Sequence, residues 1–406
     1  MRSSGSSGHG SQLLPLLAFS TVYFFDLVFR HALSAVLPWY RVDTGFSYAQ
    51  LGLILSAYFL GYGAMQIPGG ILTDKLDVRK LVIISMIVTS IIVVLFPMGN
   101  TFWQAFLIML LIGVASAVIF VGLTKLTALA FDYSVRARVQ GSWAAAGSLG
   151  GSVVMVIGPL MAAWGMWREL FYISGIIGLL ATLFAMRYIF RLKTHALGSS
   201  YVNYDGEMSF NSRELLSRKN VWLLCLAQLI FTGVAVSRTQ WTTAYLKEFT
   251  LLSAEEIAIY TVALIPASII GPIISGWVAD RIGRRNGVII CFLISNAFLA
   301  LWIWVSFPGN PLWVLILIAQ PMMIFSGAVF TNYVLAAEIG GTKYGGLITG
   351  LVNTFGMGIG GFVFPYLIGI IIEIYASYPL AFLFLVITTI LGVMLELGVK
   401  EEKMQK

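Results

Sequence analysis

Two arginines, Arg30 and Arg238, lie inside long apolar segments of the chain, 208 residues apart. A charged side chain at the depth of a membrane costs about 2.5–3.5 kcal/mol on insertion scales, so it persists there only facing a cavity or a partner. The guanidinium group stays charged and binds a carboxylate or phosphate through two parallel hydrogen bonds. We therefore predict that the two arginines hold one anion between them. The alternative for Arg238 is that its long side chain reaches to the membrane surface.

Asp26 is the only acid that the sequence places deep in an apolar segment. It precedes Arg30 by four residues, which puts both side chains on one face of an α-helix. Its carboxyl group could take up and release a proton as a bound anion comes and goes, and we predict this proton-coupling role. The alternative is a permanent ion pair between Asp26 and Arg30.

Further polar side chains interrupt the apolar segments and are candidates to line the same cavity. Tyr62 and Gln66 are four residues apart and share a helix face. The predicted binding set is Arg30, Tyr62, Gln66, Lys125, Arg238, Trp241 and Asn353. Each neutral member could instead hold two helices together, which is often worth only about 0.6 kcal/mol. Lys125 could extend to the lipid headgroups.

A charged loop occurs twice between apolar segments. It reads GILTDKLDVRK at residues 70–80 and GWVADRIGRR at residues 276–285, and its aspartates, Asp74 and Asp280, are 206 residues apart. Basic residues surround both aspartates or follow a later apolar segment: Lys75, Arg79, Arg136, Arg281 and Arg285. A charged loop repeated at about half the chain length indicates an internal duplication.

Composition indicates which elements must position these residues. Hydrophobic residues make up 59% of the chain and charged residues 11%, whereas soluble domains have about 25% charged residues. A membrane-spanning helix needs about 20 mostly apolar residues. We predict an all-α integral membrane protein with twelve transmembrane helices, near residues 12–38, 48–72, 81–98, 102–130, 139–164, 170–190, 221–245, 255–279, 287–306, 312–337, 344–372 and 378–397.

The twelve segments divide into two pseudo-symmetric six-helix halves. Three glycines of the first half, Gly141, Gly147 and Gly151, recur 209 residues later as Gly350, Gly356 and Gly360. The predicted organisation is a flexible tail (1–11), an N-terminal bundle (12–190), a polar linker (191–219), a C-terminal bundle (220–398) and a second tail (399–406).

The basic residues predict the orientation, because cytoplasmic loops carry an excess of Lys and Arg. If both termini and the linker share one side, that side holds 19 of the 25 basic residues, and the other holds only Arg41, Arg168 and Lys247. We therefore predict a multi-pass protein of the cell (inner or plasma) membrane. Both termini, the linker and both charged loops would lie in the cytoplasm.

Several classes of function leave no signature in this sequence. It contains no phosphate loop, no nucleotide-binding cassette and no His-Glu-x-x-His metal motif. The two cysteines and three histidines fit no metal spacing, and the net charge of +7 is spread over short loops. We predict a protein that is not an enzyme and that needs no cofactor, metal or nucleic-acid partner.

The second apolar segment and the duplicated loop carry a family resemblance. The segment contains QLG at 50–52, YF at 58–59, GY at 61–62 and QIPGG at 66–70, and Arg30 lies eight residues before Pro38. These features resemble the organic-anion branches of the major facilitator superfamily, namely the anion:cation symporters and the organophosphate antiporters. The resemblance implies two parallel six-helix halves around a central site.

The resemblance also implies a function. It indicates a monomeric secondary transporter that moves a small organic anion (a sugar acid, sugar phosphate or carboxylate) through the lipid bilayer by alternating access. The co-transported ion would be a proton, because Asp26 can titrate. The loop aspartates and their basic neighbours would act as cytoplasmic gates.

Some positions depart from the family pattern, and other functions stay open. Asp77 stands where the loop has glycine, Phe29 where the symporters often have aspartate, and Ser116 where their fourth helix often has glutamate. One alternative is an amino-acid or zwitterion transporter in which Asp26 binds the ammonium group. Others are an exporter of drugs or amphipathic solutes and a membrane receptor that binds without transport.

Overall fold

A computed structural model describes residues 9–192 and 218–400 of the chain. Within these ranges every regular element is a helix. Most of the predicted linker (191–219) and most of the two predicted tails (1–11 and 399–406) lie outside the described residues.

The first half of the chain contains six long helices. They are α1 (His9–Thr44), α2 (Tyr48–Lys75), α3 (Val78–Leu95) with the short η1 (Phe96–Met98), α4 (Phe102–Ala130), α5 (Tyr133–Ala163) and α6 (Trp167–Ile189). The second half contains α8 (Lys219–Ala244), η2 (Tyr245–Phe249), α9 (Ala254–Ile282), α10 (Arg284–Val305), α11 (Leu312–Ser326), α12 (Val329–Asn353), η3 (Thr354–Gly360), α13 (Gly361–Tyr375) and α14 (Tyr378–Leu397).

Twelve segments of the described chain are long and apolar enough to cross a membrane, as predicted. The tenth, Leu312–Gly341, joins α11 to the first part of α12, and the eleventh, Tyr344–Tyr375, joins the rest of α12 to η3 and α13. The backbone breaks between them at Gly341, where φ is +56°, a conformation that glycine adopts without steric cost. The chain is thus an all-α, multi-pass integral membrane protein.

Local sequence signals explain where several helices begin. In a capping box, the side chains of the N-cap residue and of the residue three positions later each accept a hydrogen bond from the other's backbone N–H. Such boxes start α2, α4 and α9, with the pairs Ser47 and Gln50, Thr101 and Gln104, and Ser253 and Glu256. These polar turns interrupt the apolar segments and separate one span from the next.

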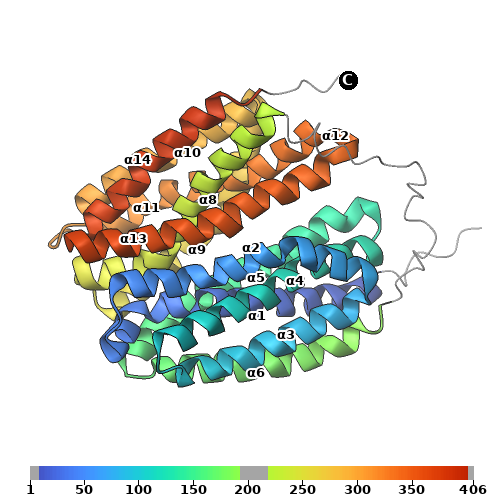
Figure 1. Ribbon diagram of the computed structural model, residues 1–406, viewed down its shortest axis with the longest axis horizontal. Coiled ribbons are helices and arrows are strands. Elements are labelled where there is room, and N and C mark those ends of the chain that lie inside the picture. The colour runs from blue at the N-terminus through green and yellow to red at the C-terminus, as the bar shows by residue number, and fades with distance from the viewer. Residues whose placement is uncertain (1–8, 193–217, 401–406) are drawn as a thin grey trace, which may run out of the picture.

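The helices form two groups that follow chain order. Figure 1 shows α1–α6 in one group and α8–α14 in the other. The groups meet at the left of this view and diverge toward the right, where the C-terminus lies. We call the end of the helices next to residues 192, 218 and 400 the linker end. The opposite end, with the loops at 45–47 and 250–253, is the far end.

Two of the three repeated glycine pairs, Gly147 with Gly356 and Gly151 with Gly360, let helices pack closely in both groups. A Cβ on Gly151 of α5 would lie 2.9 Å from the ring of His31 of α1, and one on Gly360 of η3 would lie 2.2 Å from the carbonyl oxygen of Leu229 of α8. Both contacts are closer than a side chain allows. The glycines therefore let α5 pack against α1, and η3 against α8, as an internal duplication requires.

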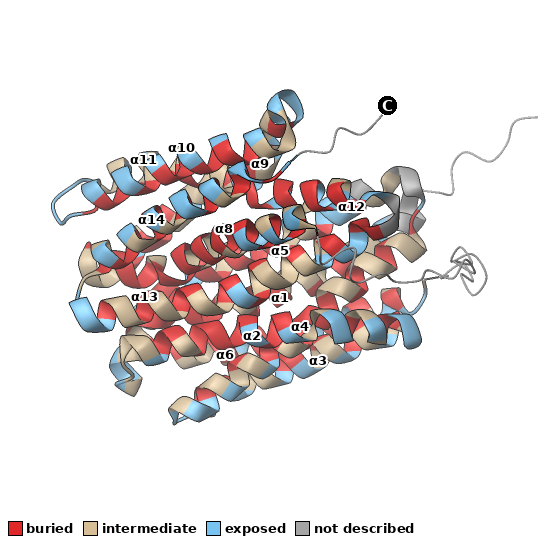
Figure 2. Cartoon of the chain, turned by 45° about the horizontal axis from the view of Figure 1, so that its top comes forward, coloured by how far each residue is buried: buried red, intermediate tan, exposed pale blue. Residues whose placement is uncertain are grey.

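Apolar side chains fill the interior and also cover the outside. Figure 2 shows buried residues running along α1, α8 and α13, with exposed residues frequent on outer helices such as α3 and α11. The exposed set includes the large aliphatic residues Ile84, Ile91, Leu107, Leu111, Ile273, Leu317 and Met394. Such an extensive apolar surface matches lipid tails rather than water.

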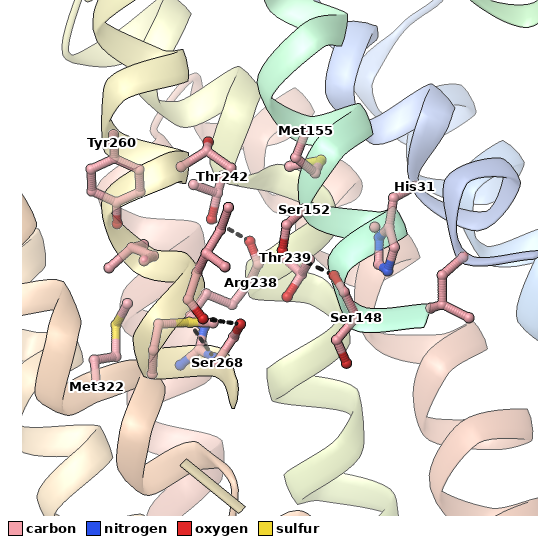
Figure 3. A pocket seen from close by; sticks show the side chains of 16 residues that line it. His31, Ser148, Ser152, Met155, Arg238, Thr239, Thr242, Tyr260, Ser268 and Met322 are labelled. Carbon is pink, nitrogen blue, oxygen red and sulfur yellow. Dashed lines mark hydrogen bonds between the residues drawn. The ribbon is translucent and has the colours of Figure 1, made fainter. Parts of the chain in front are cut away.

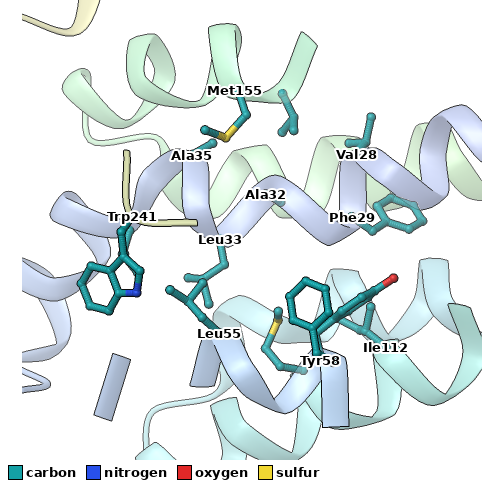
Figure 4. Packing of buried hydrophobic residues seen from close by; sticks show 14 of the residues in the cluster. Val28, Phe29, Ala32, Leu33, Ala35, Leu55, Tyr58, Ile112, Met155 and Trp241 are labelled. Carbon is teal, nitrogen blue, oxygen red and sulfur yellow. The ribbon is translucent and has the colours of Figure 1, made fainter. Parts of the chain in front are cut away.

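Helix α1 lies at the centre of the first group. Figure 4 shows it between α5, which contributes Met155, and α2, which contributes Leu55 and Tyr58. Ala32 and Ala35 of α1 are fully buried. Small side chains let neighbouring helices approach closely in a membrane, so α1 has little freedom to shift the residues that it carries.

The two groups touch closely where α2 crosses η3 and α13. A Cβ on Gly63 of α2 would lie 2.4 Å from Cα of Gly358 of η3, and one on Gly369 of α13 would lie 2.3 Å from the carbonyl oxygen of Tyr48. The backbones of the two halves are therefore in contact along this seam, with no room for a side chain.

A polar network joins the halves at the far end. The carboxylate of Glu248 accepts hydrogen bonds from the hydroxyl of Tyr48 at 2.5 Å and from that of Tyr378 at 3.0 Å. Arg41 lies 3.9 Å from the same carboxylate. The backbone N–H of Tyr48 also donates to Glu373 at 2.7 Å. Since Arg41 and Tyr48 belong to the first half and the other residues to the second, this network closes the far end.

Candidate functional site

Two neighbouring cavities lie between the halves. The first, which we call the arginine cavity, has a volume of about 250 Å³ and is lined by Arg30, Arg238 and residues of α2, α9, α11, α12 and η3. The second, the hydroxyl cavity, has a volume of about 260 Å³ and lies among α1, α5, α8, α9 and α11. Both cavities are lined by His31, Arg238, Thr239, Ser268 and Met323.

Aromatic rings hold Arg30 at the edge of the arginine cavity. Its Cζ lies 5.1 Å from the ring centre of Tyr58, 5.2 Å from that of Phe59 and 5.3 Å from that of Tyr62. Its Nη2 lies 4.0 Å from the sulfur of Met357. Cation–π contacts of this kind attract a cation without neutralising it. Among the described residues no carboxylate forms an ion pair with Arg30, so its charge is available to a ligand.

Arg238 faces the same cavity from the second half. Its Nη2 donates to the hydroxyl of Ser326 at 3.1 Å and lies 3.3 Å from the sulfur of Met323. Its Nε is buried without a hydrogen-bond partner in the described structure, and the residue is only 5% exposed. The side chain therefore does not extend to the membrane surface, and no carboxylate of the described chain forms an ion pair with it.

Asp26 does not form the ion pair with Arg30 that the four-residue spacing allowed. Its Oδ1 instead accepts a hydrogen bond from Ser116 of α4 at 2.5 Å, and the Ser116 hydroxyl lies 2.6 Å from that of Tyr58. Tyr58 in turn lies under Arg30. A hydrogen-bonded chain thus runs from the acid, through Ser116, to the ring that holds the arginine.

The structure places the neutral members of the predicted binding set around the cavities rather than on their surface. Tyr62 packs against Arg30. Gln66 lies one turn further along α2, and its buried Nε2 has no partner in the described structure. Trp241 donates from Nε1 to the carbonyl oxygen of Pro365 at 3.0 Å, which joins α8 to α13. Asn353 accepts a hydrogen bond from the hydroxyl of Tyr333 at 3.1 Å.

Lys125 lies away from both cavities. Its ammonium group donates to the backbone carbonyl of Thr73 at 2.5 Å and to Asp74 at 2.7 Å. The long side chain extends from α4 toward the charged loop at the linker end because an acid there offers an opposite charge. The structure thus groups Lys125 with the loop residues and not with the two arginines.

The two charged loops hold the last helix of their own half in the same way. Arg79 donates to the carbonyl oxygen of Leu192 at 3.2 Å, and Arg285 donates to that of Val399 at 3.1 Å. Leu192 and Val399 each come just after the last helix of a half, and the two donors are 206 residues apart. The duplication thus extends from sequence to individual contacts.

The loops differ at one matched position. Gly283 starts α10 with φ at +94°, whereas Asp77 starts α3 with φ at −63°. The carboxylate of Asp77 accepts hydrogen bonds from the backbone N–H of Arg79 at 3.0 Å and from its guanidinium group at 2.9 Å and 3.1 Å. The guanidinium group lowers the pKa of Asp77 below its usual range. The first loop therefore replaces the glycine turn with an N-cap.

The remaining loop charges also contact their own half. Asp280 pairs with Arg284, which lies 3.2 Å from Glu338. Arg281 lies over the ring of Trp277 at 3.9 Å. Arg136 donates to the carbonyl oxygen of Phe131 at 2.9 Å, and Lys75 is exposed at the end of α2.

Sequence reasoning missed three residues. His31 lines both cavities, and its Nδ1 is buried without a partner among the described residues. Glu248 organises the far-end network. Glu396, in the last turn of α14, is fully buried, with its Oε2 3.5 Å from the side-chain amide of Asn332. None of the three has a distinctive spacing, and only tertiary packing reveals them.

The sequence is similar to a family of membrane proteins and to several named transporters. The family model described as Major Facilitator Superfamily matches residues 19–365. The chain is 25% identical over 381 residues to the probable sulfoacetate transporter of Cupriavidus necator, across 89% of this chain and 87% of the relative. It is 24% identical to the glycerol-3-phosphate transporter of Bacillus subtilis (80% and 78% covered) and 23% identical to the hexuronate transporter of the same species (87% and 86% covered).

Solved structures share the fold. A bacterial homolog of the human lysosomal transporter Spinster, in an inward-facing and occupied conformation, has a TM-score of 0.80 at 15% identity, with 97% of both chains covered. The nucleoside transporter NupG has a TM-score of 0.73 at 14% identity, covering 96% of this chain and all of the other.

Proposed function

This chain belongs to the major facilitator superfamily, a family of membrane transporters and not of enzymes, and we propose that it carries a small organic anion bound between Arg30 and Arg238. One observation carries the proposal. Two arginines from opposite halves line one cavity, and neither forms an ion pair with a carboxylate of the described chain. Buried charges of this kind are costly unless a ligand of opposite charge joins them.

The relatives support an anionic substrate. Those named above are a probable sulfoacetate transporter, a glycerol-3-phosphate transporter and a hexuronate transporter, and each of these three compounds carries a carboxylate, sulfonate or phosphate group. A guanidinium group suits each of these groups because its planar fork matches two oxygen atoms at once. The anion would lie between Arg30 of the first half and Arg238 of the second. It would then contact both halves at once.

We also propose that a proton accompanies the anion. Asp26 is 3% exposed and is linked through Ser116 to Tyr58, whose ring packs against Arg30. A change in the protonation of Asp26 would change the hydrogen bonds of this chain, and through it the position of the arginine. The link would thus couple proton uptake to anion binding without a direct ion pair.

The conformation fits a transporter accessible from the linker end. The far-end network joins the halves, whereas each contact described above for the loop charges stays within one half. Alternating access would break the far-end contacts and bring the two loops together, with the gating residues Asp74, Lys75, Arg79, Arg136, Asp280, Arg281 and Arg285 at the meeting point. By the distribution of basic residues, the linker end would face the cytoplasm.

A zwitterionic substrate is less well matched to the site. An ammonium group needs a carboxylate, and within the described ranges no aspartate or glutamate lines either cavity. Asp26, which would have to supply it, is directed at Ser116. The site thus offers positive charge and neutral groups only, which favours an anion over an amino acid or a cationic drug.

Ligand-induced thermal stabilisation of the purified protein tests the proposal, since a ligand that binds only the folded state raises the melting temperature. The panel would contain sulfoacetate, glycerol-3-phosphate, glucuronate, alanine and a cationic drug. We expect an anion to stabilise the wild type. Arg30→Ala and Arg238→Ala should each weaken its binding by about 10-fold or more, because hydrogen bonds to charged groups contribute about 1.5–3 kcal/mol.

The matched control is Arg187→Ala, which removes an exposed arginine of α6 that lines neither cavity. It should respond to the anion as the wild type does. Stabilisation by the cationic drug or by alanine alone, with equal responses from all three variants, would show that the arginines do not form an anion site.

A further inference from the structure

The hydroxyl cavity adjoins the arginine cavity, and serine and threonine side chains line much of it. Six aliphatic hydroxyl groups line it, from Ser148 and Ser152 of α5, Thr239 and Thr242 of α8, and Thr261 and Ser268 of α9. Figure 3 shows Ser148 and Ser152 on one side and Thr242 and Ser268 on the other, with Arg238 between them. Both halves of the molecule therefore contribute to the wall.

Every one of these hydroxyls already uses its proton. Each donates to a backbone carbonyl of its own helix, at distances of 3.3 Å (Ser148), 3.0 Å (Ser152), 3.0 Å (Thr239), 2.5 Å (Thr242), 2.9 Å (Thr261) and 2.8 Å (Ser268). A hydroxyl group has one proton and two acceptor lone pairs. With the proton committed to the helix, the wall presents acceptors, and the ligand groups that match it are hydrogen-bond donors.

Arg238 lines both cavities, so the positively charged groups of one lie next to the hydroxyl groups of the other. On one side, guanidinium groups offer donors and positive charge to an anionic group. On the other side, hydroxyl oxygens offer acceptors, without a carboxylate that would favour an ammonium group. A matching ligand is therefore anionic at one end and carries neutral donors, such as alcohol groups, at the other.

On the premise that the chain carries an organic anion, we propose that its substrate is polyhydroxylated, as in a sugar acid or a sugar phosphate. The anionic group lies between Arg30 and Arg238, and the hydroxyl groups of the carbon chain donate to the wall of α5, α8 and α9. Anions without donors, such as sulfoacetate or a simple alkyl carboxylate, leave that wall without ligand partners and bind more weakly.

Two matched pairs of ligands test this on the purified full-length protein by isothermal titration. Glycerol-3-phosphate is compared with propyl phosphate, and glucuronate with cyclohexanecarboxylate, so that each pair shares its anionic group and differs in its hydroxyls. We expect the hydroxylated member of at least one pair to bind about 10-fold or more tightly, since each hydrogen bond contributes about 3- to 10-fold. Which pair responds identifies the anion as a phosphate or a carboxylate.

Variants of facing walls locate the effect. Ser152→Ala and Thr242→Val should each weaken the hydroxylated ligand by about 3- to 10-fold and leave its hydroxyl-free partner nearly unchanged. Thr388→Val of α14 is the matched control: its hydroxyl also donates to its own helix, to Phe384 at 2.9 Å, and it lines neither cavity. It should leave both affinities as in the wild type, which separates ligand contacts from effects on the helix.

The outcomes separate this proposal from the one on which it rests. Equal affinities within both pairs, lost together in Arg238→Ala, would overturn the polyhydroxylated substrate and keep the anion site. Equal losses in Ser152→Ala, Thr242→Val and Thr388→Val would also overturn it. If sulfoacetate binds the wild type and none of the four anions does, the hydroxyl proposal is overturned and the anion site stays. If neither sulfoacetate nor any of the four anions binds, the anion site fails and the hydroxyl proposal fails with it.

Discussion

Arg30 and Arg238 are the two arginines that line the arginine cavity, one from each half. Their place beside a cavity could be predicted from the sequence, because a permanent charge in an apolar segment needs a physical reason to be there. The position of the Lys125 side chain could not be predicted, because a long flexible side chain can reach either a cavity or a loop. Only the structure shows that it binds Asp74. His31 could not be predicted either, because its neighbours come from other helices.

At the same scale, we predict that Asp26→Asn separates proton coupling from anion binding. The amide can accept a hydrogen bond from Ser116 but cannot titrate, so the affinity for the anion should stay within about 3-fold of the wild type, the loss of at most one modest hydrogen bond. In proteoliposomes, the stimulation of uptake by an acidic outside pH should be lost. An Asp26→Asn protein that is still stimulated by the pH gradient would exclude Asp26 as the coupling group.

Ser116→Ala tests the chain between the acid and the arginine. Removing the hydroxyl breaks both contacts, to Asp26 and to Tyr58, while Asp26 can still titrate. We expect both the response of uptake to the pH gradient and the dependence of anion affinity on pH to become weaker. The measurement is a titration of the anion at several pH values. An unchanged pH dependence would show that Ser116 does not transmit the protonation state.

At the scale of helices, the membrane spans and the glycine repeat can be read from the sequence. The positions where a helix breaks or changes to a π-helical turn cannot. The ends of the spans follow from apolar length and capping signals such as Ser47. The break at Gly341 and the π-helical turns η2 and η3 have no comparable signal, because they depend on how neighbouring helices pack. The contact of Gly63 with Gly358 is of the same kind.

Gly63→Ala tests the seam between α2 and η3. The new Cβ would lie 2.4 Å from Cα of Gly358, so the backbones must separate, at a cost of about 1–3 kcal/mol for overpacking. The melting temperature in detergent should fall. Gly70→Ala in the same helix is the control, because its Cβ meets nothing within 4 Å and should be neutral or slightly stabilising. Equal melting temperatures for the two variants would show that the seam is not tightly packed.

Asp77 occupies, in the first loop, the position that Gly283 has in the second. Asp77→Ala removes the N-cap of α3 and should destabilise the protein by about 0.5–2 kcal/mol, whereas Asp77→Asn keeps a capping side chain and loses only the charge. Arg79 lowers the pKa of Asp77 in the folded state, so the stabilisation by this charge is present at neutral pH. It should be lost as the pH falls through the folded-state pKa, below the ordinary carboxyl range.

Melting temperatures measured from neutral to acidic pH test whether the stabilisation by the Asp77 charge is lost as the pH falls. The difference between the wild type and Asp77→Asn should be small, because the pair is partly exposed, and it should shrink toward zero at low pH. A difference that grows as the pH falls would contradict the assignment of the charge to a favourable pair with Arg79.

At the scale of the whole molecule, the sequence predicts two halves but not their relative position. The offset between the loop aspartates reveals the duplication, and the contacts of Arg79 and Arg285 repeat with the same offset. The conformational state could not be predicted, because all states of a transporter share one sequence. It becomes visible only in the structure, where Glu248 joins the halves at the far end.

Glu248→Gln should shift the molecule toward closure at the linker end. The amide loses the charge that faces Arg41 and can accept fewer hydrogen bonds from Tyr48 and Tyr378, so the far end opens more easily. Spin labels at Leu76 and Ile282, exposed residues at the linker end of each half, report the change as a distance distribution. We expect a larger share of short distances in the variant. An unchanged distribution would show that the far-end network does not set the balance between states.

Uptake of a labelled anion into proteoliposomes, with the tightest binder among the ligands above, tests the anion site between Arg30 and Arg238 most directly. The wild type and Arg187→Ala should show saturable uptake, because both keep the two cavity arginines. Arg30→Ala and Arg238→Ala should each reduce it by about 10-fold or more, since each loses charged hydrogen bonds to the anion. Saturable uptake that survives both substitutions would contradict an anion site between Arg30 and Arg238.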